Sequence, residues 1–394
     1  MKFPLALDTW DNEEQEALQR VIKSNRYSMG PEVFGFESEI CKMFGSKHAI
    51  MVNSGSSANL IMLTALKLLI GKNWPKNPEI IVPALSWSTT FTPFYYLGLR
   101  PVFIDINPDS LCLEPEILEQ AITSNTVGIL TVNILGQASE LENLLQISKK
   151  NGIVLLEDNC ESLGATLNNK YTGRFGLASS HSSFYSHHIS TMEGGWIQTD
   201  NDDFADICKS LRAHGWIREL GIDSKIAKRT GVPFRDQFNF ILPGLNFRPI
   251  EFEGALGKTQ LLKLPQMLEV RRRNALIFNE LFREVEGVRI QSGPGLSSWF
   301  AFSLVLDGTM KGYRDELAGK LIMNGIECRP IIAGNFTKQP VMQHLNGMIP
   351  FPLSVCDQVH DNGLYVGNHP FDLSNQLNSL HQIVVDFIRE VQDA

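Results

Sequence analysis

The alternation of short apolar runs with helical stretches is the feature that most constrains the fold of this chain. Five runs rich in apolar and β-branched residues have the length of strands: His48–Val52, Glu79–Val82, Pro101–Ile104, Val127–Asn133 and Ile153–Glu157. Helical patterns lie between them at Ala58–Ile70, which is apolar almost all round, and at Ser139–Lys150, which is followed by the stop signal Asn151-Gly152. Strands joined by helical crossovers predict an α/β fold, with a mainly parallel sheet sandwiched by helices.

The regular alternation ends after about residue 200. A helix is predicted at Asp202–His214, and residues 221–240 form a polar, irregular stretch. A long helical run then covers Glu251–Val285, and mixed helix and strand patterns follow it up to Ala394. A chain of 394 residues suits two or three domains of ~150 residues each. We therefore expect a large cofactor-binding α/β domain over residues 1–250 and a smaller C-terminal α+β domain over residues 251–394.

The composition excludes several classes of protein. No run approaches the ~18 consecutive apolar residues of a membrane span, so no membrane association is expected. The segment Met1–Asp8 turns acidic without an apolar signal core, which predicts a cytoplasmic protein. A net charge of -8 argues against nucleic acid as a partner, although it does not forbid a local phosphate site.

The cysteines argue against metal chemistry. The six cysteines lie at positions 41, 112, 160, 208, 328 and 356. Their closest spacing is the 28 residues from 328 to 356, so no C-x-C or C-x-x-C motif is present for a zinc or iron–sulfur site. We expect reduced thiols that pack as small hydrophobic side chains, and no metal site.

Three segments contain side chains that are suited to binding or catalysis. The first is Asn53-Ser54-Gly55-Ser56-Ser57-Ala58-Asn59. It follows a predicted strand and opens a predicted helix. The free backbone N–H groups, the hydroxyls and the helix dipole at such a place would hold a phosphate. A plain strand-to-helix turn with a serine N-cap is an equally good interpretation of these residues.

The second segment, Leu155–Ser162, places Asp158 at the carboxyl end of an apolar strand. Parallel sheets bind their ligands at this edge. A carboxylate there would suit the protonated pyridine nitrogen of pyridoxal phosphate, whose ring must accept electrons. An exposed acidic residue at a strand end, without a function, is the alternative.

The third segment, Ser182–Gly195, contains two adjacent histidines, His187 and His188. Adjacent side chains point in different directions on any regular backbone, so joint ligation of one metal ion is not expected. The pattern is typical of one working histidine beside one that is packed in the core or lies on the surface.

Together the three segments resemble the fold-type I pyridoxal-phosphate enzymes that act on nucleotide-linked keto-sugars, the sugar aminotransferase family. The resemblance covers nearly the whole chain and includes Gly30–Val33, Val82–Thr89 and Gly244–Arg248. It implies a fold-type I transferase and the following cofactor-binding residues: Gly55, Ser56, Ser57 and Ser182 at the phosphate, Asp158 at the pyridine nitrogen, Glu161 at the ring hydroxyl and Trp87 on the ring face. A core tryptophan is the alternative for Trp87. Asn246 matches a family asparagine that reaches the phosphate from the neighbouring subunit, which implies a homodimer with a shared active site.

One departure from the family decides the expected chemistry. His187 stands six residues before Glu193, where the family has its Schiff-base lysine, and no lysine occurs between Lys170 and Lys209. Imidazole has no primary amine, so it cannot anchor the cofactor covalently, but it can still move a proton with an ordinary pKa of ~6.5. We therefore expect His187 as the catalytic residue, with pyridoxal or pyridoxamine 5'-phosphate bound non-covalently.

This departure resembles the sugar 3-dehydratases within the family. Four further runs carry the resemblance: Arg212–Trp216, Ser297–Phe300, Glu327–Ile331 and Val366–His369. A related branch acts on CDP-linked sugars and carries an iron–sulfur cluster held by a C-x-C element. That element is missing from this sequence, so we expect no iron–sulfur cluster.

The resemblance implies removal of the 3-hydroxyl from a nucleotide-linked 4-keto-6-deoxyhexose. The expected substrate is GDP-4-keto-6-deoxymannose, with L-glutamate regenerating pyridoxamine phosphate and ammonia released, for the synthesis of colitose and O-antigen. The expected substrate-binding residues are His188, His214, Arg248 and Arg329. A packed imidazole is an equal interpretation of His188, and Arg329 would bind either glutamate or sugar phosphates, or form a surface salt bridge. The alternatives for the whole chain are a nucleotide-sugar aminotransferase and a catalytically inactive paralogue that binds sugar nucleotides.

Overall fold

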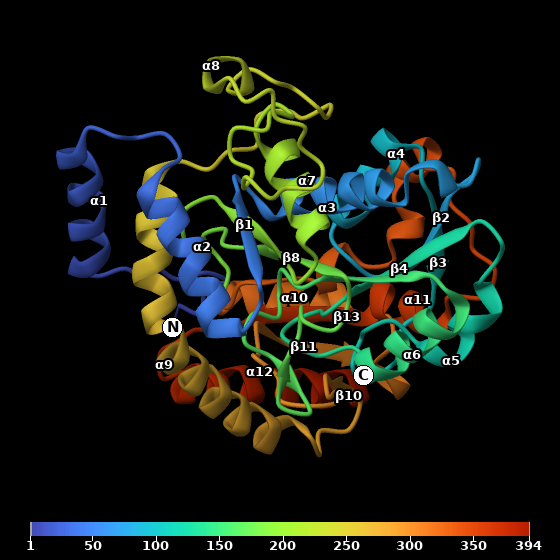
Figure 1. The fold of residues 1–394 in the computed structure, drawn as a ribbon. Coiled ribbons are helices and arrows are strands. Elements are labelled where there is room, and N and C mark those ends of the chain that lie inside the picture. Colours follow the sequence, from blue (N-terminus) through green and yellow to red (C-terminus); the bar gives the residue numbers. More distant parts are fainter. Residues whose placement is uncertain (1, 394) are drawn as a thin grey trace.

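The computed structural model describes residues 2–393, and its largest element is a seven-stranded sheet (Figure 1). The strand order is β1-β9-β8-β5-β4-β2-β3. Their bounds are β1 His48–Val52, β2 Glu79–Pro83, β3 Arg100–Ile104, β4 Thr126–Val132, β5 Val154–Asp158, β8 Ala178–Ser182 and β9 Gly195–Thr199. The pairs from β3 through β2, β4 and β5 to β8 are parallel, and β9 is antiparallel to both of its neighbours. The predicted mainly parallel sheet is confirmed.

Helices cover both faces of this sheet. Successive side chains of a strand point to opposite faces, and Ile80 and Val82 pack with the helix α3 (Gly55–Ile70), whereas Ile81 packs with α6 (Leu141–Asn151). At the β1 end, Ala49 and Met51 pack against α2 (Pro31–Phe44). Strands buried on both faces explain why the sequence shows continuous apolar runs here rather than an alternating pattern.

The remaining helices follow the sequence signals closely. Their bounds are α1 Asn12–Ser24, α4 Ser88–Leu97, α5 Pro115–Leu118, α7 Asp202–Arg212, α8 Pro233–Asp236, α9 Glu251–Phe282, α10 Arg314–Met323, α11 Ser354–Asn362 and α12 Ser374–Gln392. The N-cap of α7 is Asn201, whose side chain accepts the N–H of Phe204 at 2.9 Å. The predicted helix at 202–214 ends two residues early because the chain leaves helical geometry at Ala213.

The C-terminal part contains a second, antiparallel sheet in the order β10-β11-β13-β12. Its strands are β10 Val288–Ile290, β11 Ala301–Leu306, β12 Cys328–Pro330 and β13 Gly363–Gly367, and a short hairpin, β6 Thr166–Leu167 with β7 Lys170–Tyr171, lies apart from both sheets. Phe278 and Phe282 of α9 pack into the core of this second sheet, whereas Leu261 and Leu264 pack with α2. The 32-residue helix α9 therefore contributes to both cores. The domain boundary at residue 250 falls at its start and stays a prediction.

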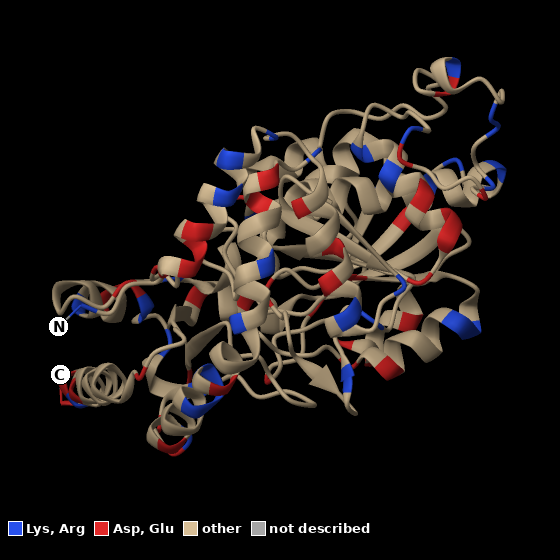
Figure 2. Ribbon diagram, turned by 60° about the vertical axis from the view of Figure 1, so that its left-hand side comes forward, with Lys and Arg blue, Asp and Glu red and all other residues tan. Residues whose placement is uncertain are grey.

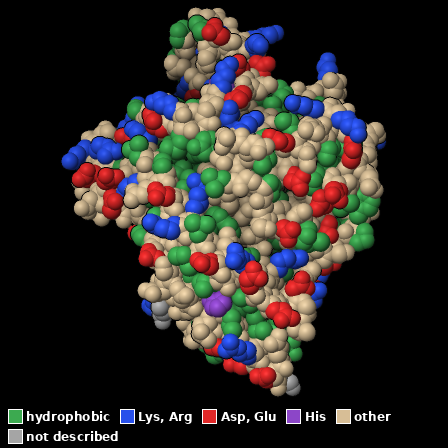
Figure 3. All heavy atoms as spheres, turned by 90° about the horizontal axis from the view of Figure 1, so that it is seen from below, with side chains coloured by type: hydrophobic (Ala, Val, Ile, Leu, Met, Phe, Trp, Pro, Cys, Tyr) green, Lys and Arg blue, Asp and Glu red, His purple; other side chains and the backbone are tan. Residues whose placement is uncertain are grey.

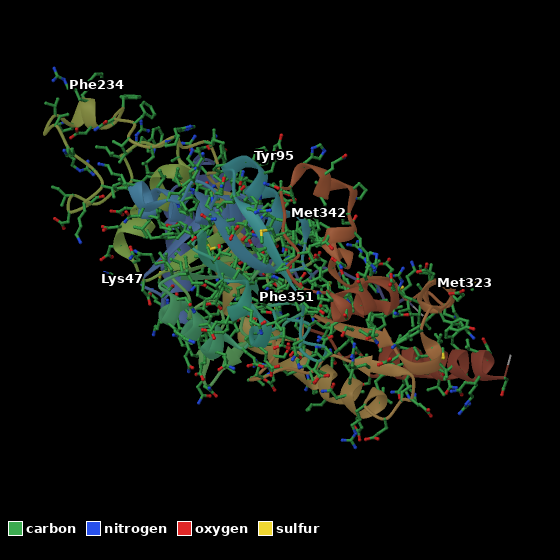
Figure 4. The ribbon with its side chains drawn as sticks, turned by 90° about the vertical axis from the view of Figure 1, so that its right-hand side faces the viewer. Lys47, Tyr95, Phe234, Met323, Met342 and Phe351 are labelled. Carbon is green, nitrogen blue, oxygen red and sulfur yellow. The ribbon has the colours of Figure 1, made fainter. Side chains whose placement is uncertain are left out.

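The irregular stretch predicted at 221–240 projects from the rest of the molecule and carries the short helix α8 (Figures 1 and 4). Phe234 lies near its tip, with 77% of its surface exposed. Elsewhere, acidic and basic residues are interspersed along the helices, and the lower face of the molecule mixes charged with apolar side chains (Figures 2 and 3). Within residues 2–393, no helix is long and apolar enough to cross a lipid bilayer.

Candidate active site

A cavity of about 520 Å³ opens at the carboxyl ends of three neighbouring parallel strands. Val132 ends β4, Asp158 ends β5 and Ser182 ends β8, and all three line the cavity. The N-terminus of α3 closes a second side, and Phe300 and Arg329 reach in from the C-terminal part of the chain. This is the edge at which parallel sheets bind ligands.

The structure brings eight of the predicted site residues together on this cavity. They are Gly55, Ser56, Trp87, Asp158, Glu161, Ser182, His187 and Arg329. Five others do not line the cavity of their own chain, namely Ser57, His188, His214, Asn246 and Arg248. The first group comes from five separate segments, and only the fold joins them.

The start of α3 forms the anion-binding corner of the cavity. Ser54 caps the helix by accepting the N–H of Ser57 at 3.1 Å, and its hydroxyl also donates to the Ser57 hydroxyl at 3.0 Å. Ser57 is therefore bonded to Ser54 in the helix cap and does not line the cavity. A Cβ atom at Gly55 would approach the Ser182 Cβ to 2.7 Å, so only glycine lets the helix start approach β8 this closely. Helix dipole, free N–H groups and hydroxyls here suit a phosphate.

Asp158 lies at the floor of the cavity with 4% of its surface exposed. Its Oδ2 accepts the side-chain N–H of Asn59 and the hydroxyl of Thr90, both at 2.8 Å. Its Oδ1 accepts the backbone N–H of Cys160 at 3.2 Å. A buried carboxylate with this many donors is held in one orientation.

Asn59 and Thr90 were not predicted as site residues. Asn59 ends the first quoted motif, and Thr90 directly follows the run that contains Trp87. Their helices, α3 and α4, start beside β5 only in the folded chain, so sequence spacing gives no sign that both contact Asp158.

Glu161 faces the same cavity. Burial, followed by the nearby charge of Asp158, raises the pKa of Glu161 to about 8, against a stabilising N–H bond from Leu135 at 2.9 Å. At neutral pH this carboxyl group is therefore mainly protonated and is able to donate a hydrogen bond. Burial also raises the pKa of the neighbouring Tyr365 phenol to about 12.

His187 lies on the loop between β8 and β9 and is partly buried. The ring of Phe300 packs edge-on against it at 5.3 Å, and Phe184 lies at 6.1 Å. Its Nδ1 is buried without a hydrogen-bond partner among the described residues. Burial, with a smaller contribution from the charge of Arg271, lowers the pKa of His187 to about 4. This differs from the ordinary value expected from the sequence, because composition does not reveal burial.

His188 lies behind the cavity wall, with 1% of its surface exposed. Its Nε2 lies 3.2 Å from the backbone carbonyl oxygen of Ser298, and its ring packs against Phe300 at 5.7 Å. Burial, reinforced by the charge of Arg271, keeps the pKa of His188 well below its ordinary value. Of the two interpretations left open by the sequence, the geometry is that of the packed imidazole.

Three of the predicted residues form a separate cluster around Trp216. The ring of His214 packs edge-on against Trp216 at 5.0 Å, and the guanidinium of Arg248 lies 5.5 Å from the Trp216 ring centre. The Nε of Arg248 donates to Oδ1 of the exposed Asn246 at 3.1 Å. None of these residues lines the cavity of its own chain.

Trp87 and Arg329 stand at the mouth of the cavity. Trp87 is 56% exposed, which rules out the alternative of a core tryptophan. Arg329 is exposed and makes no ion pair with any described residue, so the alternative of a surface salt bridge is not observed within residues 2–393. Both side chains are accessible to a bound molecule.

No group of three or more metal-binding side chains is found within residues 2–393, and all six cysteines are free thiols. Cys160 alone among them lines the cavity. Burial, followed by the charge of Asp158, raises the pKa of its thiol well above the ordinary value. It is therefore a protonated, unreactive side chain.

Sheet, cavity edge and buried strand-end carboxylate together define the class of the protein, a pyridoxal-phosphate-dependent transferase of fold type I. The model of the DegT/DnrJ/EryC1/StrS aminotransferase family matches residues 8–378. The chain belongs to this family, as the sequence motifs predicted.

Relatives with known functions share the fold along nearly the whole chain. The GDP-4-keto-6-deoxy-D-mannose 3-dehydratase of Yersinia pseudotuberculosis is 44% identical over 98% of this chain and 98% of its own length. A solved structure of GDP-4-keto-6-deoxymannose-3-dehydratase with a trapped PLP-glutamate geminal diamine is 43% identical, covers 97% of this chain and 100% of its own, and superposes with a TM-score of 0.94. A variant of that enzyme with bound GDP-perosamine gives the same identity, coverage and TM-score.

Proposed function

We propose that this protein is a pyridoxamine-phosphate-dependent 3-dehydratase of a GDP-linked 4-keto-6-deoxyhexose, GDP-4-keto-6-deoxymannose. It removes the 3-hydroxyl, uses L-glutamate to recharge the cofactor and releases ammonia. The product class, a 4-keto-3,6-dideoxy sugar nucleotide, suits colitose and O-antigen synthesis in the cytoplasm. The identity to the Yersinia enzyme and the GDP-perosamine and PLP-glutamate complexes of the relatives support this choice of partners.

One observation carries the proposal: His187 occupies the cavity where the family has its lysine. None of the described residues that line the cavity is a lysine. Without a primary amine in reach, the protein cannot hold its cofactor covalently as a Schiff base. The chemistry left to this site is proton transfer, which imidazole performs.

The other cavity residues fit the cofactor by their donor and acceptor types. The helix start at Gly55 and Ser56, with the Ser182 hydroxyl, offers donors to the phosphate. Asp158 would accept from the protonated pyridine nitrogen, and the protonated Glu161 would donate to the ring oxygen. Trp87 would pack on the ring. Bound pyridoxamine phosphate supplies the amine that joins the 4-keto group and the ring that accepts electrons.

His187 performs both proton transfers of the dehydration. Because its Nδ1 is buried and unpartnered, the nitrogen that reaches the cavity is Nε2. The lowered pKa keeps the imidazole neutral at pH 7, so Nε2 accepts a proton as the general base. The same low pKa makes the resulting imidazolium a strong acid, which then protonates the departing 3-hydroxyl. One residue thus acts first as a base and then as an acid.

A second copy of the chain completes the site in this proposal. Asn246, His214 and Arg248 lie together near Trp216 and do not line the cavity of their own chain. In a homodimer, this cluster would serve the cavity of the neighbouring subunit, with Asn246 at the cofactor phosphate and the cations near the nucleotide phosphates. Arg329 then binds either glutamate or the sugar phosphates from within its own chain.

Two experiments test the proposal. The purified protein is incubated with GDP- or CDP-linked 4-keto-6-deoxyhexose and glutamate, and loss of the 3-hydroxyl and release of ammonia are measured. We expect ammonia with the GDP-sugar. A catalytically inactive paralogue would release none, and a better CDP-sugar turnover would overturn the choice of nucleotide. The second experiment is borohydride reduction of the holo-protein: cofactor fixed to the chain would instead favour the aminotransferase alternative.

A further inference from the structure

The segment Ser297–Phe300, here called the clamped segment, has an unusual set of backbone contacts. Each of its four consecutive carbonyl oxygens accepts from a different side chain: Ser297 from Arg272 Nε at 3.0 Å, Ser298 from His188 Nε2 at 3.2 Å, Trp299 from Asn368 Nδ2 at 2.8 Å and Phe300 from Arg271 Nη1 at 3.3 Å. Loop carbonyls usually bond to water or to backbone, so four side-chain donors in a row leave this loop a single conformation.

The N–H groups of the clamped segment are also bonded, and they connect it to the cavity. The N–H of Ser298 donates to the Gly136 carbonyl at 2.9 Å and that of Phe300 to the Leu135 carbonyl at 3.2 Å. The N–H of Leu135 in turn donates to the Glu161 carboxyl. The segment thus links two residues that line the cavity, Glu161 and Phe300.

The backbone of the segment is held in an unfavourable conformation. Trp299 has φ = 50°, in the left-handed region that bulky side chains avoid. Such a residue persists only where its surroundings over-determine it, and this is commonest at functional sites. Here the over-determination comes from the four side-chain donors.

Two of the four donors are groups that a core seldom buries. Arg271 is 3% exposed and makes no ion pair with any described residue, and carbonyl oxygens are its acceptors: those of Phe300 and, in a very short contact, Asn368. His188 donates from Nε2, and its Nδ1 has no partner among the described residues. Burying such groups is costly unless they are needed for the contacts that they make.

The result of the clamping is the position of the Phe300 ring. This ring packs against both histidines, at 5.3 Å from His187 and 5.7 Å from His188. Since Nδ1 of His187 lacks a hydrogen-bond partner, aromatic contacts restrict this imidazole where a carboxylate or carbonyl usually would.

We infer that His188 and Arg271 are positioning residues for His187, which act by clamping the segment 297–300 so that Phe300 fixes the imidazole at the cavity wall. The effect on turnover rests on the proposed function, but the geometry of the clamp does not. His188 then neither touches the substrate nor exchanges a proton with it.

Paired variants of His188 test this inference. In His188→Gln a side-chain amide can still donate to the Ser298 carbonyl, and in His188→Leu the donor is lost at similar volume. We expect kcat for dehydration to fall by roughly 10²-fold in His188→Leu, because misplacing a catalytic group by about 1 Å costs this much, with most of kcat restored in His188→Gln. KM for the sugar nucleotide stays unchanged in both. A raised KM with intact kcat in both variants would show that His188 binds substrate, and the inference would be wrong.

A second readout needs neither cofactor nor turnover. The full chain freed of cofactor is treated with diethyl pyrocarbonate, and modification of each histidine is followed by peptide mass spectrometry. In His188→Leu, release of Phe300 should make His187 react about tenfold faster, as expected for the loss of a buried hydrogen bond, while His188→Gln resembles the unmutated protein. His181, 2% exposed and stacked on Trp196 at 4.9 Å, is the internal control for intact folding. Unchanged reactivity of His187 in His188→Leu would overturn the inference, even if the chain proved not to be a dehydratase.

Arg271→Lys provides the second test if His188→Leu fails to fold and exposes His181. Both carbonyls accept from the same nitrogen, Nη1 of Arg271. A lysine side chain is shorter and its ammonium falls short of that position, so His187 should again react faster and kcat should fall with KM intact. The matched control is Arg273→Lys on the exposed face of the same helix, which should change neither. Equal behaviour of the two lysine variants would contradict the role of Arg271.

Discussion

The two walls of the cavity differ in how their main side chains are hydrogen-bonded. The carboxylate wall, around Asp158, is a strand end whose oxygens accept from Asn59, Thr90 and the Cys160 N–H. The histidine wall, around His187, is a loop whose imidazole makes no hydrogen bond from Nδ1 and touches aromatic rings instead. The first wall is satisfied before any ligand binds, and the second is not.

This difference suits the two walls to different tasks: the carboxylate wall to binding the cofactor, and the histidine wall to proton transfer. A carboxylate with both oxygens engaged is held in place, which is what a partner for a protonated ring nitrogen requires. An imidazole that is to accept and return a proton needs a free nitrogen and a changeable charge. Mutations at the histidine wall should therefore affect turnover, and those at the carboxylate wall should affect cofactor binding.

The largest effect is expected for His187→Asn. Asparagine keeps polarity but transfers no proton, so dehydration should fall by about 10²–10⁴-fold while cofactor affinity stays unchanged. Turnover is followed by ammonia release and affinity by cofactor absorbance, with His344→Asn on the exposed surface as control. Retained turnover would show that another residue is the base.

Asp158→Asn should produce the converse pattern. Loss of the charge-assisted contact to the cofactor should weaken binding by about 10–100-fold, as is typical for a hydrogen bond to a charged group. Titration of the cofactor into the cofactor-free protein measures this, with the exposed Asp109→Asn as control. If affinity were retained and only kcat fell, the separation of the two walls would be lost.

A smaller effect on the same wall is expected from Thr90→Val. The variant removes one of the two side-chain bonds to Asp158 Oδ2, which should weaken cofactor binding by about fivefold. Thr92→Val, on the same helix, removes only a bond to the Ser88 carbonyl and should leave binding unchanged. Equal affinities of the two variants would indicate that Thr90 is not needed to orient the carboxylate.

The histidine wall should lose stability in acid. Burial lowers the pKa of His187 to about 4 and that of His188 well below the ordinary 6.5. Between pH 6.5 and 4 the unfolded chain binds protons that the folded chain excludes, so stability falls as the pH falls. Thermal melting of the cofactor-free protein should show a Tm that declines over this range, and less steeply in His187→Asn. An identical slope in the variant would contradict the burial of this imidazole.

The smallest effect, of opposite sign, is expected at Glu161. Its pKa is raised to about 8, so the unfolded chain loses its proton near the ordinary value while the folded chain keeps it. The contribution of this group to stability is full below pH 4.5 and is lost as the pH rises towards 8. The Tm of Glu161→Gln should therefore fall less between pH 5 and 8 than that of the unmutated protein. A parallel decline would show that the carboxyl group is not protonated.

Local sequence patterns predicted five of the seven strands of the large sheet, β1 to β5, to within one or two residues. Strands β1 to β5 appear as buried apolar runs because both of their faces are covered, and turns and helix caps mark their ends. The position of Asp158 at the ligand-binding edge of the sheet follows from the parallel pairing of β5 with β4 and β8. The long helix α9 was also predicted, but not that one half packs on α2 and the other on the second sheet.

The site was predicted only in part, for a physical reason. The roles of motif residues such as Gly55, Asp158 and His187 could be predicted from their residue types and from their places at the end of a strand or on a loop. Phe300 and Tyr365 carry no such signal, because a phenylalanine or tyrosine in a strand region is typical of any core. Their role depends on which carbonyl or ring lies next to them.

The sequence by itself determined the fold class, the family and the exchange of lysine for histidine, because these depend on local periodicity and on residue identity. Tertiary structure alone decided the electrostatics. Burial shifts the pKa of His187 downward and that of Glu161 upward, and it places His188 behind the wall with its Nε2 on the Ser298 carbonyl. Desolvation and hydrogen bonding depend on neighbours from distant segments, and the chain brings these together only when it folds.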